Sequence, residues 1–239
     1  MNPTIEQIFA TGAVLDAAGT SRPNIVSSMS REGGTLLYDL VRSIRPQRSI
    51  ETGMAYGLST LFICQALRDN GAGRHTAIDP FQAKSFDNVG LGSLERAALR
   101  DLVRFYEAPS DEVLPALRAA GERFDFAFID GDHRFDAALV DFFYIDRMLE
   151  PGGHLAIDDL AIAPVRKVMS YALRNAAYRL VRPPTAARPP AWRRLLRLAR
   201  RVLQNPLGPD WALKLVPHNV AVLRKVDGTR RPWRDHRRF

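Results

Sequence analysis

Acidic side chains follow two apolar segments that come one after the other in the chain. The first segment, Phe124–Ile129, ends at Asp130, and the second, residues 154–157, ends at Asp158 and Asp159. Short apolar runs of this kind are typical of strands that are buried on both faces of a parallel sheet. The carboxyl ends of parallel strands lie at one edge, where open α/β sheets bind ligands. We therefore expect these three carboxylates to lie close together.

Carboxylates crowded at one edge repel each other. Two unit charges about 4 Å apart cost roughly 4 kcal/mol at an effective dielectric near 20. A divalent cation would remove this repulsion, and ligand sets made only of oxygen suit Mg²⁺, Ca²⁺ or Mn²⁺. The sequence therefore predicts that Asp130, Asp158 and Asp159 bind one cation. The alternative is that acids such as Asp132 and Asp158 only cap helices or lie in loops.

A glycine-bearing turn is a second candidate site. The predicted strand Arg48–Thr52 leads into a turn that contains Gly53 and Gly57, and a predicted helix over residues 61–68 follows. A strand, a tight turn and a helix N-terminus form a cradle for a nucleotide-like ligand. The Gly-x-x-x-Gly spacing differs from the Gly-x-Gly-x-x-Gly of dinucleotide folds. An ordinary strand-to-helix turn is the alternative interpretation.

Asp79 comes directly after a predicted second strand at residues 76–78. A carboxylate in this place can accept hydrogen bonds from the two vicinal hydroxyls of a ribose. The glycine-bearing turn and Asp79 together indicate a ligand that contains a nucleoside.

The alternation of predicted strands and helices favours a doubly wound, mostly parallel α/β sheet of seven strands. The strands are expected at Arg48–Thr52, 76–78, Val103–Tyr106, Phe124–Ile129, 154–157, 178–181 and 219–225. Helices are expected at residues 3–15, 34–44 with Ser30 as its cap, 61–68, 93–99, from a cap at Ser110 or Asp111 to Ala119, between the fourth and fifth strands up to Pro151-Gly152-Gly153, and 165–175. Residues 21–28 and 84–92 are expected to be loops.

The composition restricts the class of protein. The chain has 239 residues, 46% of them hydrophobic, which suits one α/β domain with additions. It contains no long apolar run and no signal-peptide pattern, so neither a membrane span nor export is expected. The single cysteine, Cys64, fits a reducing compartment, and we expect a cytoplasmic protein. The net charge of +8 is compatible with an anionic partner, although an arginine-rich composition bias gives the same charge.

The motifs at these sites resemble those of a known family. The turn ETGMAYG, the acid after the second strand, IDGDH after the fourth and PGG-strand-DD at the fifth are similar to class I S-adenosylmethionine-dependent methyltransferases. The resemblance covers roughly residues 30–182 and 218–226, and it is nearest to metal-dependent O-methyltransferases of the catechol, caffeoyl-CoA and macrocin types. It implies S-adenosylmethionine as cofactor, with contacts at Glu51, Gly53, Ala55, Gly57, Ser59, Asp79, Pro80, Ser110 and Asp130.

The same resemblance implies a chemistry for the acids. Asp130, Asp158 and Asp159 would hold Mg²⁺, or else Mn²⁺ or Ca²⁺, and a hydroxyl of a small molecule or glycoside would accept the methyl group. His133 stands where the plant and animal enzymes have lysine. With an unperturbed pKa near 6.5 it would serve as the catalytic base at neutral pH. Neighbouring carboxylates would raise its pKa, and a bound cation would offset that increase. The alternative is a surface residue at the start of a helix.

This interpretation divides the chain into two parts. Residues 1–45 are expected to form a helical lid or a dimer element, and residues 46–239 a methyltransferase domain with an insertion at 183–217. Within the insertion, residues 191–203 predict a basic amphipathic helix. Such a helix suits an anionic membrane surface, an acidic substrate or a partner groove, and a solvated helix that covers the site is the alternative. The basic, aromatic tail from Arg230 is expected either to be disordered or to fold back on the domain.

Two other functions remain as alternatives. A nicotinamide-dependent oxidoreductase is disfavoured because the third glycine is missing and because the fifth strand ends in two acids. A nucleic-acid-binding protein of the same fold is the other. Nucleic-acid N-methyltransferases of this fold usually carry an Asn/Asp-Pro-Pro-aromatic motif after the fourth strand, where this chain has IDGDH. Nucleic acid is therefore not expected as a partner.

Overall fold

The computed structural model describes residues 1–16, 19–23, 29–181, 219–230 and 232–239, together with Trp192, Leu195, Leu196, Ala199 and Leu213. Most of the insertion 183–217, and with it most of the predicted basic helix 191–203, lies outside the described residues. None of the helices in the described ranges is both long and apolar enough to cross a membrane.

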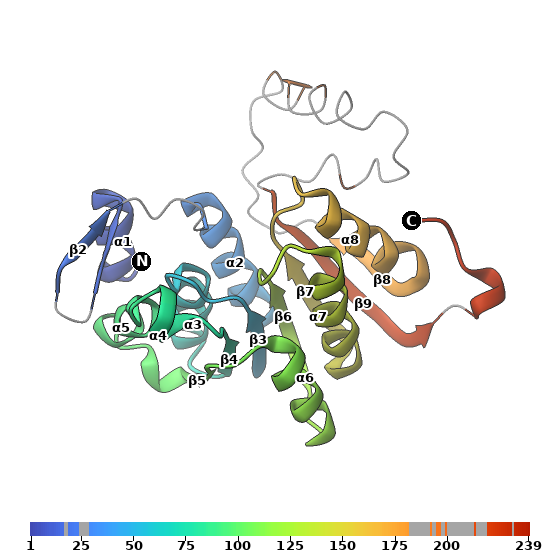
Figure 1. Ribbon diagram of the computed structural model, residues 1–239, viewed down its shortest axis with the longest axis horizontal. Coiled ribbons are helices and arrows are strands. Elements are labelled where there is room, and N and C mark those ends of the chain that lie inside the picture. The colour runs from blue at the N-terminus through green and yellow to red at the C-terminus, as the bar shows by residue number, and fades with distance from the viewer. Residues whose placement is uncertain are drawn as a thin grey trace.

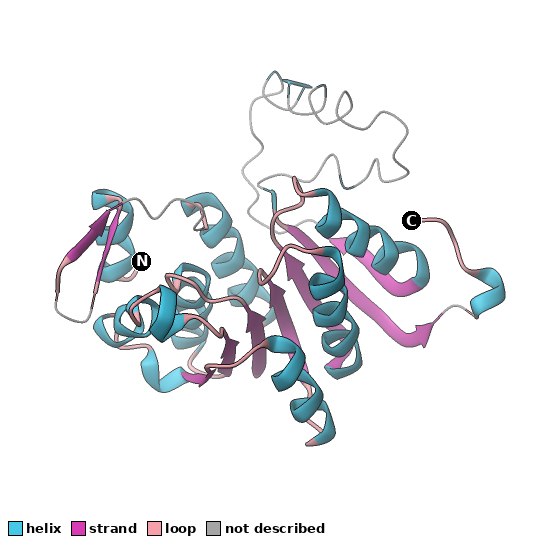
Figure 2. Cartoon of the chain, in the orientation of Figure 1, coloured by secondary structure: helices cyan, strands magenta, loops and turns pink. Residues whose placement is uncertain are grey.

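A seven-stranded sheet forms the centre of the molecule (Figures 1 and 2). Its strand order is β5-β4-β3-β6-β7-β9-β8, and the first five of these strands are parallel. The last two strands, β9 and β8, are antiparallel to their neighbours. This arrangement confirms the predicted doubly wound sheet. The strands are β3 Arg48–Thr52, β4 Arg74–Ile78, β5 Val103–Tyr106, β6 Phe124–Ile129, β7 Leu149–Ile157, β8 Ala176–Val181 and β9 Ala221–Arg230.

Helices cover both faces of the sheet, so that two hydrophobic cores form. Alternate residues of each central strand point to opposite faces: Phe126 and Phe128 pack in the first core, and Ala127 and Ile129 in the second. The first core lies under α1 Pro3–Thr11, α2 Arg31–Ile44, α3 Leu58–Asn70 and α5 Val89–Arg96. The second lies under α6 Ser110–Ala119, α7 Phe135–Met148 and α8 Ala163–Asn175, on the other side of the sheet in Figure 1.

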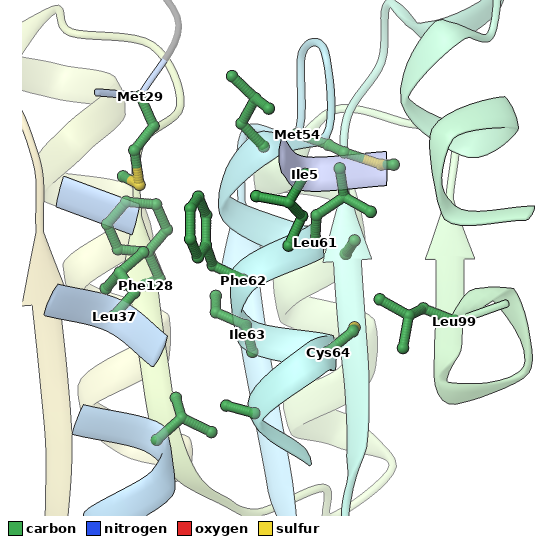
Figure 3. Close-up of a cluster of buried hydrophobic side chains, with 14 of the residues drawn as sticks. Ile5, Met29, Leu37, Met54, Leu61, Phe62, Ile63, Cys64, Leu99 and Phe128 are labelled. Atoms are coloured by element: carbon green, nitrogen blue, oxygen red, sulfur yellow. The ribbon is translucent and has the colours of Figure 1, made fainter. Parts of the chain in front are cut away.

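Phe62 of α3 is the centre of the first core. It is 1% exposed and lies beside Phe128, Met29 and Leu37 in Figure 3. Helix α2 approaches it so closely that a Cβ on Gly34 would overlap the Phe62 ring. Full burial of a side chain of this size contributes about 1.5–3 kcal/mol. The N-terminal helices are thus packed on the sheet layer through α3.

The N-terminal segment differs from its prediction. The helix expected over residues 3–15 ends at Thr11, because Gly12 adopts a left-handed conformation with φ 66° and caps it. Strand β1 Ala13–Leu15 then pairs with β2 Ser21–Pro23, in a segment that was expected to be a loop. The predicted cap of α2 is confirmed, since Ser30 Oγ accepts a hydrogen bond from the Gly33 N–H.

Two further predictions about local structure are wrong. The expected loop at 84–92 contains α4 Gln82–Ser85 and the start of α5, because Gly90 lets α5 pack against the backbone of Ala55 and Gly57. Pro151-Gly152-Gly153 does not close a helix but lies inside β7, which begins at Leu149. In addition, α6 begins at Ser110 without a side-chain cap.

The C-terminal tail folds back on α8. Of the two alternatives predicted for the tail, disorder and folding back on the domain, the second is therefore observed. Asn175 exchanges hydrogen bonds with the backbone of Arg237, and the ring of Tyr171 packs against His236 and Phe239.

Candidate functional site

The ends of β3, β6 and β7 form one edge of the sheet. Strand β6 lies between the other two, with Ile129 opposite Thr52 on one side and Ile157 on the other. Backbone hydrogen bonds continue one residue further, from Asp130 N to Thr52 O at 2.9 Å and from Asp158 N to Ile129 O at 3.2 Å. The predicted meeting of the acids at this edge is therefore observed.

Asp130, His133 and Asp159, here called the acid cluster, converge at this edge. Each offers one ligand atom, and these atoms all lie within 4.8 Å of one another. His133 Nε2 is 3.0 Å from Asp159 Oδ2 and 3.5 Å from Asp130 Oδ1. Asp158 is not part of this group among the described residues. Its Oδ1 instead accepts a hydrogen bond from the Asp159 N–H at 2.7 Å.

The orientation of Asp159 depends on a residue that the sequence analysis did not select. Asp159 has a left-handed backbone with φ 57°, which is uncommon for residues other than glycine, although Asp and Asn adopt it more often than most. Asn219, just before β9, donates from Nδ2 to Asp159 Oδ1 at 2.9 Å. Its own Oδ1 accepts from the Ala161 N–H at 2.7 Å. Asn219 thus fixes one oxygen of Asp159 and leaves the other oxygen facing His133.

The proximity of these groups changes their pKa values. The close contacts with Asp130 and then Asp159 raise the pKa of His133 to about 10, and its contact in turn holds the pKa of Asp159 below the ordinary value. Burial, followed by the charge of Asp130, raises the pKa of Asp158 to about 7. Burial also raises the pKa of Asp130 to about 6, against the opposing effect of His133. The carboxylates thus raise the pKa of His133 as the sequence analysis expected, and its role as a base stays a prediction.

The glycine turn, residues 53–57, adopts the conformation that its glycines allow. Gly53 has φ 84° and Gly57 has φ 79°, both left-handed. A Cβ on Gly53 would overlap the carbonyl oxygen of Asp130, and one on Gly57 would lie 2.9 Å from Gly90 Cα. The backbone of the turn is therefore in direct contact with the strand end that carries Asp130.

Asp79 holds the glycine turn in place through hydrogen bonds to its backbone. It is 3% exposed, and its Oδ2 accepts from the Met54 N–H at 3.0 Å and from the Ala55 N–H at 2.7 Å. Its Oδ1 accepts from the Phe81 N–H at 2.7 Å. Asp79 thus shapes the turn directly, and its contact with a ribose stays a prediction.

Glu51 and Ser59 face each other inside the protein. The Glu51 carboxylate is fully buried and accepts hydrogen bonds from the hydroxyls of Ser59 and Thr60. His75 Nε2 lies 3.3 Å from it. In this arrangement Glu51 supports the start of α3. Its predicted contact with the cofactor is untested, as are those of Pro80, which is half-buried beside Asp79, and Ser110, the first residue of α6.

A small pocket of about 30 Å³ lies at the glycine turn. Four of the predicted cofactor contacts line it, together with Met29 and Tyr56: Gly53, Ala55, Ser59 and Asp130. This volume is far smaller than the roughly 300–1,000 Å³ of typical ligand pockets. A larger hollow of about 250 Å³ lies between α1, β1 and α5, and none of the predicted site residues lines it.

Asp141 of α7 is a second residue that the sequence analysis did not select. Asp141 Oδ1 and Thr52 Oγ1 are buried, and within the described residues neither has a hydrogen-bond partner of good geometry. Burial raises the pKa of Asp141 to about 6, although the nearby hydroxyls of Ser110 and Thr52 lower it. The signal in the sequence was a lone acid in the apolar helix segment ALVDFFYI.

Comparison with known proteins gives consistent matches. Residues 50–160 match a family model described as a methyltransferase domain. A caffeoyl-CoA O-methyltransferase of Stellaria longipes is 30% identical over 121 residues, which cover 49% of this chain and 48% of the relative. A catechol O-methyltransferase of Mycobacterium tuberculosis is 28% identical over 166 residues, which cover 65% of this chain and 71% of the relative.

A solved structure shares the fold. The O-methyltransferase from Bacillus cereus in complex with SAH has a TM-score of 0.62 at 19% identity, over 76% of this chain and 83% of that one. The matched segment spans only about half the length of the plant relative. Residues 50–160 thus match a methyltransferase domain, the chain is similar in sequence to caffeoyl-CoA and catechol O-methyltransferases, and it shares its fold with a solved O-methyltransferase.

Proposed function

We propose that this chain transfers a methyl group from S-adenosylmethionine to a hydroxyl of a small molecule or glycoside, with a divalent cation at the acid cluster. The observation that carries the proposal is the position of Asp130. Asp130 lines the pocket at the glycine turn and is also a member of the acid cluster. The expected cofactor site at the glycine turn and the acid cluster therefore share the carboxylate of Asp130.

The acid cluster fits a divalent cation. Each of its three residues offers one ligand atom, and these atoms lie within 4.8 Å of one another. A cation in this place would neutralise the carboxylates of Asp130 and Asp159. Asp130 and Asp159 would hold it, with Asp158 and His133 beside them. When bound, the cation lowers the pKa of a coordinated hydroxyl and orients it, and S-adenosylmethionine supplies a methyl group on a positively charged sulfur.

The chain's own residues chiefly position the reactants. In an in-line displacement the carbon–sulfur bond breaks while a carbon–oxygen bond forms, so alignment of the two reactants provides much of the rate. Asp79 fixes the glycine turn through the N–H groups of Met54 and Ala55, and Asn219 fixes Asp159. The proton of the hydroxyl must leave, and His133, 3.0 Å from Asp159 at this edge of the sheet, is the predicted acceptor.

Calorimetry tests the proposal directly. We expect S-adenosylmethionine to bind the chelator-treated chain, and we expect added Mg²⁺ or Mn²⁺ to increase transfer of a labelled methyl group to a catechol used as the probe acceptor. Absence of binding at millimolar S-adenosylmethionine, or binding of NAD in its place, contradicts the proposal.

Several finer features belong to the proposal and stay predictions. They are Mg²⁺ as the ion, with Mn²⁺ or Ca²⁺ as alternatives, a homodimer formed through residues 1–45, and a cytoplasmic location. A further one is contact of residues 191–203 with an anionic membrane. Trp192, Leu195 and Leu196 are more than half exposed, at 57%, 65% and 63%. This exposure supports a surface contact, since apolar area gains about 25 cal/mol per Å² on leaving water.

A further inference from the structure

We infer that Gln82 is a positioning residue for the cofactor: it holds the Ala55 carbonyl and thereby aims the Tyr56 N–H at the carboxylate in the methionine part of S-adenosylmethionine. This inference rests on the proposed function, because it concerns how that cofactor binds at the glycine turn. It adds a residue of α4 that the sequence analysis did not select.

Gln82 and Asp79 hold the backbone of Ala55 by both of its polar groups. The Gln82 side chain is fully buried, and its Nε2 donates a hydrogen bond to the Ala55 carbonyl oxygen at 2.6 Å. Asp79 Oδ2 accepts a hydrogen bond from the Ala55 N–H at 2.7 Å. One buried side chain thus acts as the donor and the other as the acceptor for the same residue.

These contacts fix a backbone conformation that alanine rarely adopts. Ala55 has φ 46°, in the left-handed region, where its Cβ is crowded. Such a conformation persists only where the surroundings determine it. Gly90 of α5 closes the remaining side, since a Cβ there would lie 2.8 Å from both the Ala55 carbonyl oxygen and Gln82 Oε1. The Gln82 amide is therefore confined to the place from which it holds Ala55.

A fixed carbonyl also fixes the N–H that follows it. The peptide between Ala55 and Tyr56 is trans, so the Tyr56 N–H points in the direction opposite to the Ala55 carbonyl, away from Gln82. This N–H makes no hydrogen bond to the part of the chain that the structure describes. Ala55 and Tyr56 both line the pocket at the glycine turn. The Tyr56 N–H is thus a donor that a ligand can use.

The electrostatics of the turn favour a carboxylate as the acceptor. Helix α3 begins at Leu58 without a side-chain cap, so the positive end of its dipole comes directly after the turn. The carboxylate is the anionic group of S-adenosylmethionine, and carboxylates accept strong hydrogen bonds from backbone N–H groups. It is therefore the part of the cofactor that the Tyr56 N–H would bind.

Two ligands separate this role from a purely structural one. S-adenosylhomocysteine carries the carboxylate, whereas methylthioadenosine has the same nucleoside and sulfur but lacks it. Gln82→Met keeps an unbranched side chain and removes the donor. We expect this variant to bind S-adenosylhomocysteine about 10–100-fold more weakly than the parent, as for the loss of one hydrogen bond to a charged group. Its affinity for methylthioadenosine, measured in the same calorimeter, should stay close to that of the parent.

Asn70→Leu is the matched control. Asn70 is another buried amide, and its Nδ2 donates to the Val41 carbonyl at 3.0 Å, at the other end of α3. Its loss should lower the melting temperature and leave the ratio of the two affinities unchanged. If Gln82→Met changes both affinities equally, or changes neither, Gln82 only supports the fold and the inference is wrong.

A measurement on the unmodified chain makes the test independent of how the variants fold. In the parent with isotope-labelled tyrosine, the amide signal of Tyr56, assigned by its absence in Tyr56→Phe, should move downfield with S-adenosylhomocysteine and not with methylthioadenosine. If S-adenosylhomocysteine binds and this signal does not respond to the carboxylate, the inference fails and the proposed function stands. If the parent binds neither ligand, the proposed function fails as well.

Discussion

Asn219 and Asp159 are joined by a hydrogen bond of 2.9 Å across 60 positions of the chain, from just before β9 to just after the end of β7. The antiparallel pairing of β9 with β7 brings the two residues together. The position of a carboxylate in the acid cluster thus depends on a strand that follows the insertion.

The first prediction concerns Asn219. Asn219→Gly keeps the left-handed backbone, φ 62°, and removes the side chain that orients Asp159. We expect the affinity for a divalent cation to fall by about 10–100-fold, as for other outer-shell residues of metal sites. Calorimetry with Mn²⁺ measures this change. Asn219→Asp is the matched control: it retains an oxygen but loses the donor, so it should weaken binding similarly, and parent-like binding in both variants contradicts the role of Asn219.

The second prediction concerns Asp158 and acid pH. Because the pKa of Asp158 is raised to about 7 in the folded protein, the folded state binds an extra proton between about pH 4 and pH 7. The free energy of unfolding of the metal-free chain should therefore decrease as pH rises through this window. Asp158→Asn should remove that decrease. It should also stabilise the metal-free chain at pH 8 by roughly 1–3 kcal/mol, which is less than the free energy that corresponds to the whole increase in the pKa of Asp158. Urea unfolding at several pH values measures it, and destabilisation at pH 8 would show that Asp158 is a structural cap.

The third prediction concerns His133 and alkaline pH. The pKa of His133 is raised to about 10, so its stabilising contribution is fully present below its ordinary value near 6.5 and is lost as pH rises toward 10. The melting temperature of the metal-free parent should fall over this window, and that of His133→Gln should fall less. Differential scanning calorimetry in the presence of chelator compares the two chains. If the melting temperatures of both chains fell equally with pH, the pKa of His133 would not be raised by the carboxylates in the folded protein.

The fourth prediction uses two glycines of the same helix. A Cβ on Gly90 would lie 2.8 Å from the Ala55 carbonyl oxygen, whereas one on Gly92 would meet only the guanidinium of Arg96 at 3.3 Å. Gly90→Ala should displace α5 from the glycine turn and weaken binding of S-adenosylmethionine. Gly92→Ala should leave binding intact and stabilise the helix by up to about 1 kcal/mol, since alanine is the better helix former. Thermal unfolding and calorimetry test both, and equal effects of the two variants contradict the packing argument.

The fifth prediction concerns Asp79. Asp79→Ala leaves the buried N–H groups of the glycine turn without their acceptor, at about 1–3 kcal/mol for each group. We expect a lower melting temperature and weaker binding of S-adenosylmethionine together. Asp79→Asn, which keeps one acceptor oxygen, should give a smaller effect on both. A variant that loses binding with no change in melting temperature would indicate a contact with the ligand alone.

Local sequence patterns were sufficient to predict the sheet and the meeting of the acids at one of its edges. Buried strands such as β6 and β7 are continuous apolar runs, and the acids that follow them must lie at one edge once the strands are parallel. The approach of α5 to the glycine turn was missed, because the glycines that permit close packing also resemble loop residues. The hydrogen bond between Asn219 and Asp159 was missed for a different reason. It depends on strand pairing over a long separation and on the left-handed backbone of Asp159, neither of which leaves a local pattern.

The contact between Gly53 and the Asp130 carbonyl has a consequence for how two ligands bind. If the chain binds a nucleoside at the glycine turn and a cation at the acid cluster, as proposed, we expect a shift of the turn to reach Asp130, because the two backbones are in close contact and Asp130 belongs to the acid cluster. Binding at one place would then change the free energy of binding at the other. By thermodynamic linkage, the factor by which a cation alters the affinity for S-adenosylmethionine equals the factor by which S-adenosylmethionine alters the affinity for the cation. We therefore expect the two proposed sites to bind their ligands cooperatively.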